Sequence, residues 1–499
     1  MAIREVKVKN GRLLGAPSGI PSVTVFRGIP YAAPPVGKLR WAPPQPAADW
    51  EGLRVAHSFA PVAMQPTAPV PEAMDKEELE YTEPMSEDRL YLNVWTPAKS
   101  PEERLPVFVW IHGGAFFAGH SYGTNVDGDY FAKRGVILVS IAYRLGVFGF
   151  MGHPALCAEN EQGVCGNYGI LDQLFALKWV HENIAAFGGD PEKITVGGQS
   201  AGASSVQAVT ASPLCRGLGL VGAVMMSGVA MPKAEFIEPA PMQTAAEFGE
   251  KLLAEMGLKS LEEARAMPAE DFLNGASAAS NKLMGRFGMP FKPVVDGYVL
   301  PKLPSEAAMA GEIADLAYMV GHTDEILLDM PFTTMEAYEG WLRAKFGPEA
   351  EAAKAAFQLP NQMALLPVRP NSIRGGLIAA SHAFCRCNAR LGKKPSYYYY
   401  FDHKLPGDET GAFHGGEMWY FFHVLHRCWR PFEGFDHKLA DVCAAYLLNF
   451  VKTGDPNGDG LLHWEPDTDE QPSVMRLSNP IHDQLGPESA GYEFWIERI

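Results

Sequence analysis

Two short apolar runs restrict this chain to folds built around a buried sheet. They cover residues 107–111 (Val-Phe-Val-Trp-Ile) and 136–142 (Val-Ile-Leu-Val-Ser-Ile-Ala), and turn residues bound each of them. Apolar residues fill nearly every position instead of alternating with polar ones, which is typical of parallel strands covered on both faces. Both runs are therefore predicted to be central strands.

The segments that follow alternate between helix and strand. Residues 171–187 carry apolar side chains at mostly helical spacing and end at a Gly-Gly-Asp-Pro stop. Residues 194–196 are a short strand-like run, and a stretch rich in Ala and Ser, without helix breakers, follows Ser200. This alternation predicts a large, mostly parallel sheet with helices on both faces.

Later segments extend this α/β pattern. Residues 223–226, 316–320 and 397–401 are predicted strands. Residues 240–285, in which Ala, Glu, Leu, Lys and Met dominate, are predicted to form a helical insertion over the active site.

The sequence shows no repeat, no low-complexity tract and no clear linker. The proline-rich segments 30–46 and 61–84 are predicted to be ordered loops packed on the body, because aromatic and apolar residues interleave with their prolines. We therefore expect a single domain over residues 1–499.

Composition excludes several classes of protein. Hydrophobic residues make up 47% and charged residues 20% of the 499, which is ordinary for a folded globular chain. The formal net charge of −16 repels phosphate backbones and anionic membrane surfaces, so we expect no nucleic-acid partner. No apolar run approaches the roughly 18 residues that span a bilayer.

The chain's opening and its cysteines bear on its compartment. Residues 1–7 lack the apolar stretch of a signal peptide, which predicts a cytoplasmic protein, although a chain whose signal had been removed would look the same. Seven cysteines are few and odd in number, which favours reduced thiols. Cys385 and Cys387 are too close together for an ordinary zinc half-site, and pairing of Cys157 with Cys165 stays open.

The pentapeptide Gly-Gln-Ser-Ala-Gly at residues 198–202 is the first candidate for catalytic chemistry. In a chain with 50 glycines the Gly-x-Ser-x-Gly pattern alone is weak, and a plain turn at a strand end is the alternative. Here, however, it follows a predicted strand and precedes a predicted helix. A nucleophile elbow requires that context, because the serine takes a strained backbone conformation that only small neighbours allow. Ser200 is therefore the candidate nucleophile.

A glycine-rich loop after the strand 107–111 offers donors for a developing oxyanion. It runs His-Gly-Gly-Ala-Phe-Phe-Ala-Gly over residues 112–119, and its small residues let backbone amides approach a substrate. The amides of Gly114 and Ala115 are the candidates, together with that of Ala201 just after the serine. Without the elbow, the loop would be an ordinary glycine-rich turn.

The base is expected to be one of fourteen histidines. His414 is the best placed, because it lies in a loop beyond the tyrosine-rich strand and follows the serine in chain order. His403, in the same connection, is a surface-loop alternative. His423 and His426 fit a helix with polar edges better than a metal site.

The acid that orients the histidine is expected after the strand 316–320. Asp324 and Glu325 both follow it, and a carboxylate at the C-terminal end of a parallel strand faces the catalytic edge. The residues alone do not choose between them, and either would also fit as a solvated loop charge.

Together these motifs resemble the type-B carboxylesterases, a family that includes bacterial p-nitrobenzyl esterases, feruloyl esterases and cholinesterases. The resemblance runs nearly end to end. Besides the serine motif it rests on residues 26–32, 86–94, 166–173, 187–191 and 453–457. It implies an α/β-hydrolase fold and a serine carboxylesterase that needs no metal or cofactor. It also implies a Ser-Glu-His triad, which selects Glu325 over Asp324, and an oxyanion hole at Gly114, Ala115 and Ala201.

Three departures from the family pattern bear on specificity. Ala63 and Arg89 stand where secreted relatives usually carry a disulfide, which agrees with a reduced compartment. Gln199 replaces a common glutamate, which removes a negative charge and disfavours quaternary ammonium esters. Ala115 replaces a glycine in the oxyanion loop and adds a methyl group near the carbonyl, which affects esters of bulky alcohols.

The expected activity is hydrolysis of short-chain or aryl carboxylic esters of small molecules through an acyl-enzyme. A feruloyl esterase is the alternative, since the pocket predicted from Phe116, Phe117, Gln199 and Trp419 is largely aromatic, although aromatic residues in such positions are more often core. A non-catalytic binding module and a lipase with a lid at 240–285 are further alternatives. A monomer and a dimer both fit the sequence.

Overall fold

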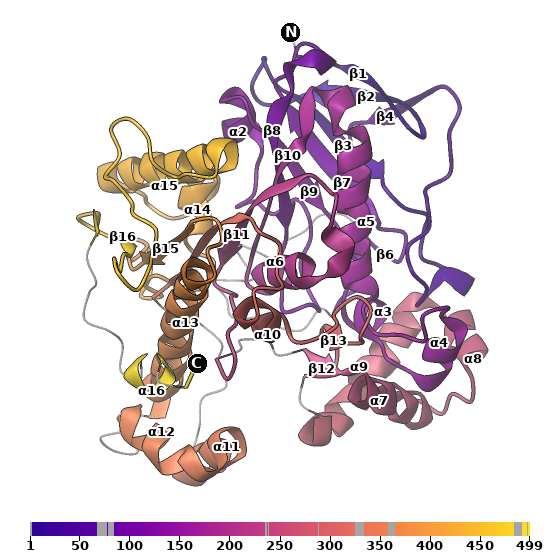
Figure 1. Ribbon diagram of the computed structural model, residues 1–499. Coiled ribbons are helices and arrows are strands. Elements are labelled where there is room, and N and C mark those ends of the chain that lie inside the picture. Colours follow the sequence, from indigo (N-terminus) through magenta and orange to yellow (C-terminus); the bar gives the residue numbers. More distant parts are fainter. Residues whose placement is uncertain are drawn as a thin grey trace.

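The computed structural model describes residues 2–66, 77, 84–234, 237, 239–287, 289–324, 334–357, 365–483, 492–496 and 498–499. Within these ranges the centre of the molecule is a twisted 13-stranded sheet (Figure 1). In spatial order its strands are β1 (Glu5–Val8), β2 (Gly11–Pro17), β3 (Thr24–Pro30), β7 (Tyr91–Thr96), β9 (Ile137–Ile141), β8 (Leu105–Ile111), β10 (Gly189–Gln199), β11 (Leu220–Met226), β14 (Ala317–Thr323), β15 (Ser396–Phe401), β16 (Met475–Leu477) and β17 (His482–Asp483), with β4 (Leu53–Ala56) beside β2.

The middle of the sheet, from β9 to β16, is parallel throughout. The pairs between β1, β2, β3, β7 and β9 at one edge, and between β16 and β17 at the other, are antiparallel. The carboxyl ends of β8, β10, β11, β14 and β15 consequently meet at one edge, where a site in such a sheet is expected. The prediction of a large, mostly parallel sheet is confirmed.

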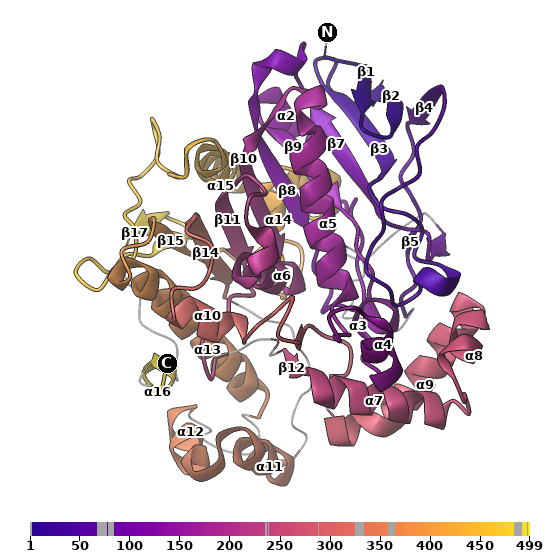
Figure 2. The ribbon, with the colours of Figure 1, turned by 45° about the vertical axis from the view of Figure 1, so that its right-hand side comes forward.

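Helices cover both faces of this sheet. Alternate residues of β8 supply the two faces. Val107 and Val109 enter the core under α5 (Tyr168–Asn183), α6 (Ala201–Ala211) and α13 (Leu365–Arg390). Phe108 and Trp110 enter the core under α14 (Met418–Phe421) and α15 (Gly434–Thr453). Figures 1 and 2 show α5 and α6 on one side of the strands and α15 on the other. This two-sided burial explains why the strand sequences are apolar at nearly every position.

The helices have the following bounds: α2 Asp129–Lys133, α3 Gly146–Phe150, α4 Pro154–Glu159, α5 Tyr168–Asn183, α6 Ala201–Ala211, α7 Met242–Glu255, α8 Leu261–Ala266, α9 Ala269–Phe287, α10 Pro304–Met309, α11 Met335–Phe346, α12 Ala350–Ala356, α13 Leu365–Arg390, α14 Met418–Phe421, α15 Gly434–Thr453 and α16 Tyr492–Ile496. Two small strand pairs join β5 (Val62–Ala63) to β6 (Met85–Ser86), and β12 (Ala240–Pro241) to β13 (Val294–Val295).

Helices α7, α8 and α9 fall within the segment predicted to be a helical insertion. They lie together beside α3 and α4 at the lower right of Figure 1. Their apolar faces, including Phe248, Leu252 and Phe272, form a separate small core with Trp41 and Phe148. The helices therefore have a hydrophobic core of their own beside the one that covers the sheet.

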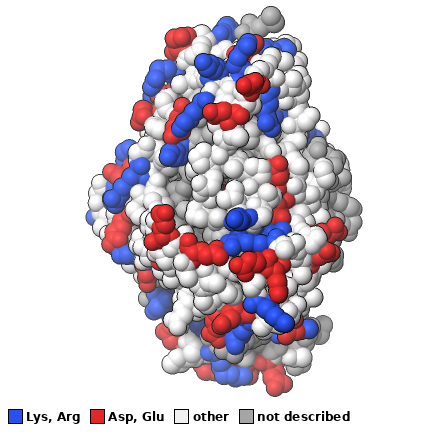
Figure 3. Space-filling model, turned by 90° about the vertical axis from the view of Figure 1, so that its right-hand side faces the viewer, with Lys and Arg blue, Asp and Glu red and all other residues white. Residues whose placement is uncertain are grey.

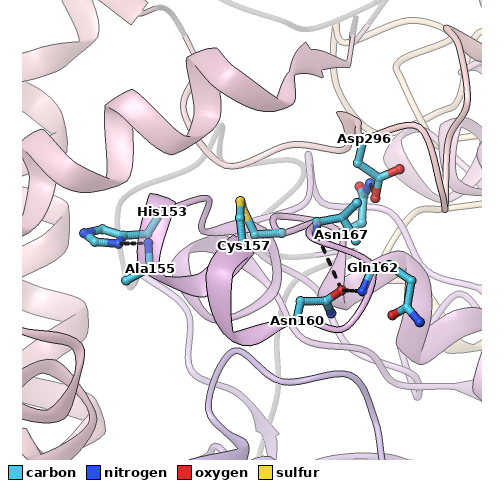
Figure 4. The surroundings of a disulfide bond; sticks show 9 residues. His153, Ala155, Cys157, Asn160, Gln162, Asn167 and Asp296 are labelled. Atoms are coloured by element: carbon cyan, nitrogen blue, oxygen red, sulfur yellow. Dashed lines mark hydrogen bonds between the residues drawn. A yellow bond between two sulfur atoms is a disulfide. The ribbon is translucent and has the colours of Figure 1, made fainter.

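A disulfide joins Cys157 in α4 to Cys165 in the loop that follows (Figure 4). The loop between them turns at Asn160, whose side chain accepts hydrogen bonds from the backbone amides of Gln162 and Val164. This turn brings the two Cα atoms within 5.0 Å. The pairing of these two cysteines, which the sequence left open, is therefore present. Cys385 and Cys387 are free and buried.

The proline-rich segments, the predicted absence of a membrane span and the surface charge can be compared with the described residues. Loop 30–46 is described, but most of 61–84 and all of Glu325 lie outside the described residues. In the described part of the chain, no helix is long and apolar enough to cross a membrane. On the face drawn in Figure 3, acidic and basic side chains are interspersed. The excess of acidic residues behind the net charge of −16 therefore forms no separate acidic patch on that face.

Candidate active site

Ser200 occupies a sharp turn between β10 and α6. Its backbone has φ 57° and ψ −125°, in the left-handed half of the Ramachandran plot that non-glycine residues rarely adopt. Its amide donates to the carbonyl of Met226, the last residue of β11, at 2.8 Å. The strained conformation is thus held by the neighbouring strand, as a nucleophile elbow requires.

The glycines around Ser200 are there because no side chain fits. A Cβ at Gly202 would lie 2.2 Å from the carbonyl oxygen of Ile111, and one at Gly198 would lie 2.4 Å from the carbonyl carbon of Gly202. A Cβ at Gly228 would lie 2.2 Å from the carbonyl oxygen of Ser200. The first two glycines belong to the Gly-x-Ser-x-Gly pattern, so steric crowding of the elbow accounts for that pattern.

The glycine-rich loop after β8 lies directly against this turn. A Cβ at Gly113 would lie 3.1 Å from the Cβ of Ser200. Gly114, Ala115 and Phe116 are three consecutive residues with positive φ, at 103°, 51° and 66°. Within the described chain, the backbone amides of Gly114, Ala115 and Ala201 donate to no other residue. They are the donors predicted from the sequence.

Buried side chains support this loop. Gln65 accepts from the amide of Gly119 at 2.9 Å, and the Tyr143 hydroxyl donates to the carbonyl of His112 at 2.9 Å. The ring of His112 stacks on that of Tyr143, with centroids 4.5 Å apart. Burial lowers the pKa of His112 well below its usual value, so the imidazole is neutral.

His414 reaches the same place from the loop after β15. It is fully buried, and its Nε2 lies 3.3 Å from the side-chain amide nitrogen of Gln199, the residue before Ser200. Burial lowers the pKa of His414 to about 4, so the ring is neutral at physiological pH and is able to accept a proton. The fold therefore brings Gly113, Gln199, Ser200 and His414 together from three strand ends.

The carboxylate expected from the resemblance, Glu325, is outside the described residues. Asp324, the alternative, directly follows β14: its amide donates to the carbonyl of Phe401 at 2.9 Å, and its carboxylate accepts from the hydroxyl of Tyr400. Asp324 is thus anchored to β15, the strand that precedes the loop of His414.

Comparison with known proteins decides the family. A sequence profile described as "Carboxylesterase family" matches residues 3–354 and 377–495. The chain belongs to the carboxylesterase family. It is 33% identical to the fumonisin B1 esterase of Sphingopyxis macrogoltabida, covering 94% of this chain and 86% of that protein. It is also 33% identical to the para-nitrobenzyl esterase of Bacillus subtilis (strain 168), covering 93% of each.

Solved structures agree. A carboxylesterase of Geobacillus stearothermophilus superposes with a TM-score of 0.81 at 34% identity, over 97% of this chain and 98% of the other. The protein is therefore a serine carboxylic ester hydrolase with an α/β-hydrolase fold, as the sequence resemblance implied.

Two further residues of this carboxylesterase support the histidine loop. Glu417 is fully buried three residues after His414, and Ser227 Oγ donates to its carboxylate at 3.1 Å. Burial raises the pKa of Glu417 to about 7. Ser227 Oγ also accepts a hydrogen bond from the backbone amide of Thr323 at 3.4 Å. Ser227 and Glu417 together therefore link the end of β11, β14 and the loop of His414. Neither residue was predicted from the sequence, although Glu417 lies only three residues after His414.

The tentative pocket residues occupy different surroundings. Phe116 is fully buried and packs edge-on against Phe150, whereas Phe117 is 37% exposed. Trp419 is buried and donates from Nε1 to Glu77 at 2.9 Å. Gln199 adjoins both the serine and the histidine. Of the four, Phe117 is thus the one exposed to solvent, and Gln199 is the one in contact with His414.

The other candidate histidines have separate partners. His403 pairs with Asp436 at 2.8 Å, and His423 pairs with Asp441 at 2.8 Å. In the described residues, no group of three or more His, Cys, Asp or Glu side chains could hold a metal ion.

Proposed function

We propose that this carboxylesterase hydrolyses short-chain or aryl esters of small molecules through an acyl-enzyme formed on Ser200, with His414 as base and Glu325 as the orienting acid. The proposal depends above all on Ser200, a strained serine at a strand-to-helix turn beside a loop with unused amides. Gln199, the residue before it, lies 3.3 Å from a buried neutral histidine, His414.

The proposed reaction has two halves. In the first, Nε2 of His414 takes the hydroxyl proton of Ser200 as its Oγ attacks the ester carbonyl, and the amides of Gly114, Ala115 and Ala201 stabilise the oxyanion. The imidazolium then protonates the departing alcohol. In the second, His414 takes a proton from water as the water oxygen attacks the acyl-enzyme carbonyl. The imidazolium then returns the proton to Oγ of Ser200 as the bond to the acyl carbon breaks, which frees the acid and regenerates the serine. Glu325 stabilises the imidazolium in both halves.

Replacement of Ser200 by alanine tests this assignment. We expect Ser200→Ala to lower kcat for p-nitrophenyl butyrate on the order of 10⁴-fold or more, because the nucleophile is lost while the fold is kept. Ser204→Ala, four residues later in α6, is the matched control and keeps its activity. Substantial turnover by a folded Ser200→Ala protein would refute the proposal.

The substrate class is supported by similarity and by charge. A relative of known activity takes para-nitrobenzyl esters, and Gln199 is uncharged. We therefore expect p-nitrobenzyl acetate to be hydrolysed. We also expect butyrylthiocholine to be no better a substrate than its neutral analogue 3,3-dimethylbutyl thiobutyrate. Methyl ferulate tests the alternative: turnover of methyl ferulate well above that of p-nitrobenzyl acetate would replace the proposal with a feruloyl esterase.

A further inference from the structure

A small cavity between the segments that precede β7 and follow β9 is lined by three arginines. Arg40, Arg89 and Arg144 surround it, together with Glu87, Met64 and Phe148. All three arginines are at least 96% buried. The cavity has room for one particle about the size of a water molecule.

Two of the three arginines are neutralised by carboxylates. Arg40 donates from Nε and Nη2 to the two oxygens of Glu87, at 2.7 and 2.6 Å. Arg144 donates from Nε and Nη2 to the two oxygens of Asp172, at 2.8 and 2.7 Å. Both are bidentate pairs, so each carboxylate is committed to its own arginine. Each guanidinium also donates to backbone carbonyls: Arg144 to that of Ala42, and Arg40 to those of Ala264 and Met267.

Arg89 is the arginine of this cluster that neither Glu87 nor Asp172 neutralises. In the described part of the chain, its Nε and Nη1 are buried without a hydrogen-bond partner. Tyr31 and Tyr143 lie near it, but their hydroxyls already donate to the carbonyls of Ala142 and His112. Burial also raises the pKa of both tyrosines, so neither supplies a negative charge.

The guanidinium of Arg89 nevertheless keeps its charge at neutral pH. Burial lowers its pKa only to about 10, still above physiological pH. The three arginines that line the cavity and the two carboxylates that pair with them, Glu87 and Asp172, therefore carry three positive and two negative charges. A buried cation with open donors is costly unless an anion or another strong acceptor satisfies it.

We propose that this cavity is a binding site for a small monovalent anion of the halide class, held by the open N–H groups of Arg89. One such ion balances the net charge of the cluster and accepts the unused hydrogen bonds.

The site lies behind the oxyanion loop. The charge of Arg89 contributes to the low pKa of His112, which immediately precedes Gly113. Tyr143, whose hydroxyl holds the carbonyl of His112, is also within electrostatic reach of Arg89. The bound anion thus moderates a positive charge directly behind this loop.

Bromide provides the test, because it is a halide that can be located by anomalous scattering. We expect a crystal of the full chain soaked in sodium bromide to show an anomalous peak within hydrogen-bond reach of the Arg89 guanidinium. Absence of this peak from a fully soaked crystal would overturn the proposal, whatever the behaviour of any variant.

Thermal unfolding gives an independent measurement. At constant ionic strength with gluconate as the replacement anion, the melting temperature of the protein should rise with bromide concentration and then level off. Arg89→Met should abolish this rise, whereas Arg216→Met, at an exposed arginine, should retain it. Equal responses of all three proteins would contradict a site at Arg89. Neither measurement depends on esterase activity, so each separates this inference from the proposed function.

Discussion

Replacing Gln199 by glutamate should move the acidic limit of activity to higher pH. The Gln199 amide nitrogen lies 3.3 Å from Nε2 of His414, and both side chains are buried. Glutamate has nearly the same shape as glutamine, so it would place a negative charge beside the imidazole with little change in packing. An adjacent negative charge favours the protonated imidazole and therefore raises its pKa.

The size of the effect follows from the geometry. Two opposite charges about 4 Å apart attract by about 4 kcal/mol at an effective dielectric constant of about 20, and burial of the new carboxylate offsets part of this. We therefore expect the pKa of His414 to rise by about one to three. Burial lowers it to about 4 in the native protein. Because protonated His414 cannot accept the proton of Ser200, the variant should lose kcat/KM between about pH 7 and pH 5, where the native enzyme stays active.

The assay is kcat/KM for p-nitrophenyl butyrate from pH 4 to pH 9, read at a wavelength where the product's absorbance is independent of pH. Gln199→Leu is the control, because it removes the amide without adding a charge and should leave the acidic limit in place. Far-UV circular dichroism at each pH shows whether the protein stays folded, since a histidine with a lowered pKa itself reduces stability as the pH falls below 6.5. An acidic limit that stays put or moves to lower pH in Gln199→Glu would refute the reasoning.

Three further perturbations test other contacts. Gly202→Ala places a Cβ 2.2 Å from a carbonyl oxygen and should lower both the melting temperature and the esterase activity. The control is Gly340→Ala, in an open position inside α11, which should raise the free energy of unfolding by about 0.5–1 kcal/mol and therefore raise the melting temperature. Arg430→Met leaves buried Glu77 without its ion pair and should cost about 3–5 kcal/mol in urea unfolding; an unchanged midpoint would contradict this. For Glu417, a native pKa of about 7 against an ordinary 4.5 adds about 3 kcal/mol of stability at low pH that is lost as the pH rises toward 7. As the pH rises over that range, the melting temperature of Glu417→Gln should accordingly fall less than that of the native protein. Parallel plots of melting temperature against pH for the two proteins would disprove this role of Glu417.

The centre of the fold was predictable because its signals are local. The continuous apolar runs of β8 and β9 show burial on both faces, and the crowding at Gly198 and Gly202 leaves a pattern in five consecutive residues. Strand β1, in contrast, was overlooked. Its alternation of Glu5, Val6, Lys7 and Val8 is the weaker signal of a strand exposed on one face.

The hydrogen bonds that hold the site residues in place were not predictable, because they join distant parts of the chain. Ser227 and Glu417 are 190 residues apart, and Gln199 and His414 are 215 apart. Nothing local marks these residues as partners. The pairing of Cys157 with Cys165 was undecided for a similar reason, since spacing alone does not tell whether a turn such as that at Asn160 brings the sulfur atoms together.

Covalent labelling tests most directly whether Ser200 is the nucleophile. The native protein is treated with a fluorophosphonate and digested with trypsin, and the fragment ions of the peptide 194–216 locate the adduct among its serines. The account predicts one adduct, on Ser200, which forms in proportion to the loss of esterase activity. Loss of activity with the label on another residue, or full activity with Ser200 labelled, would contradict it.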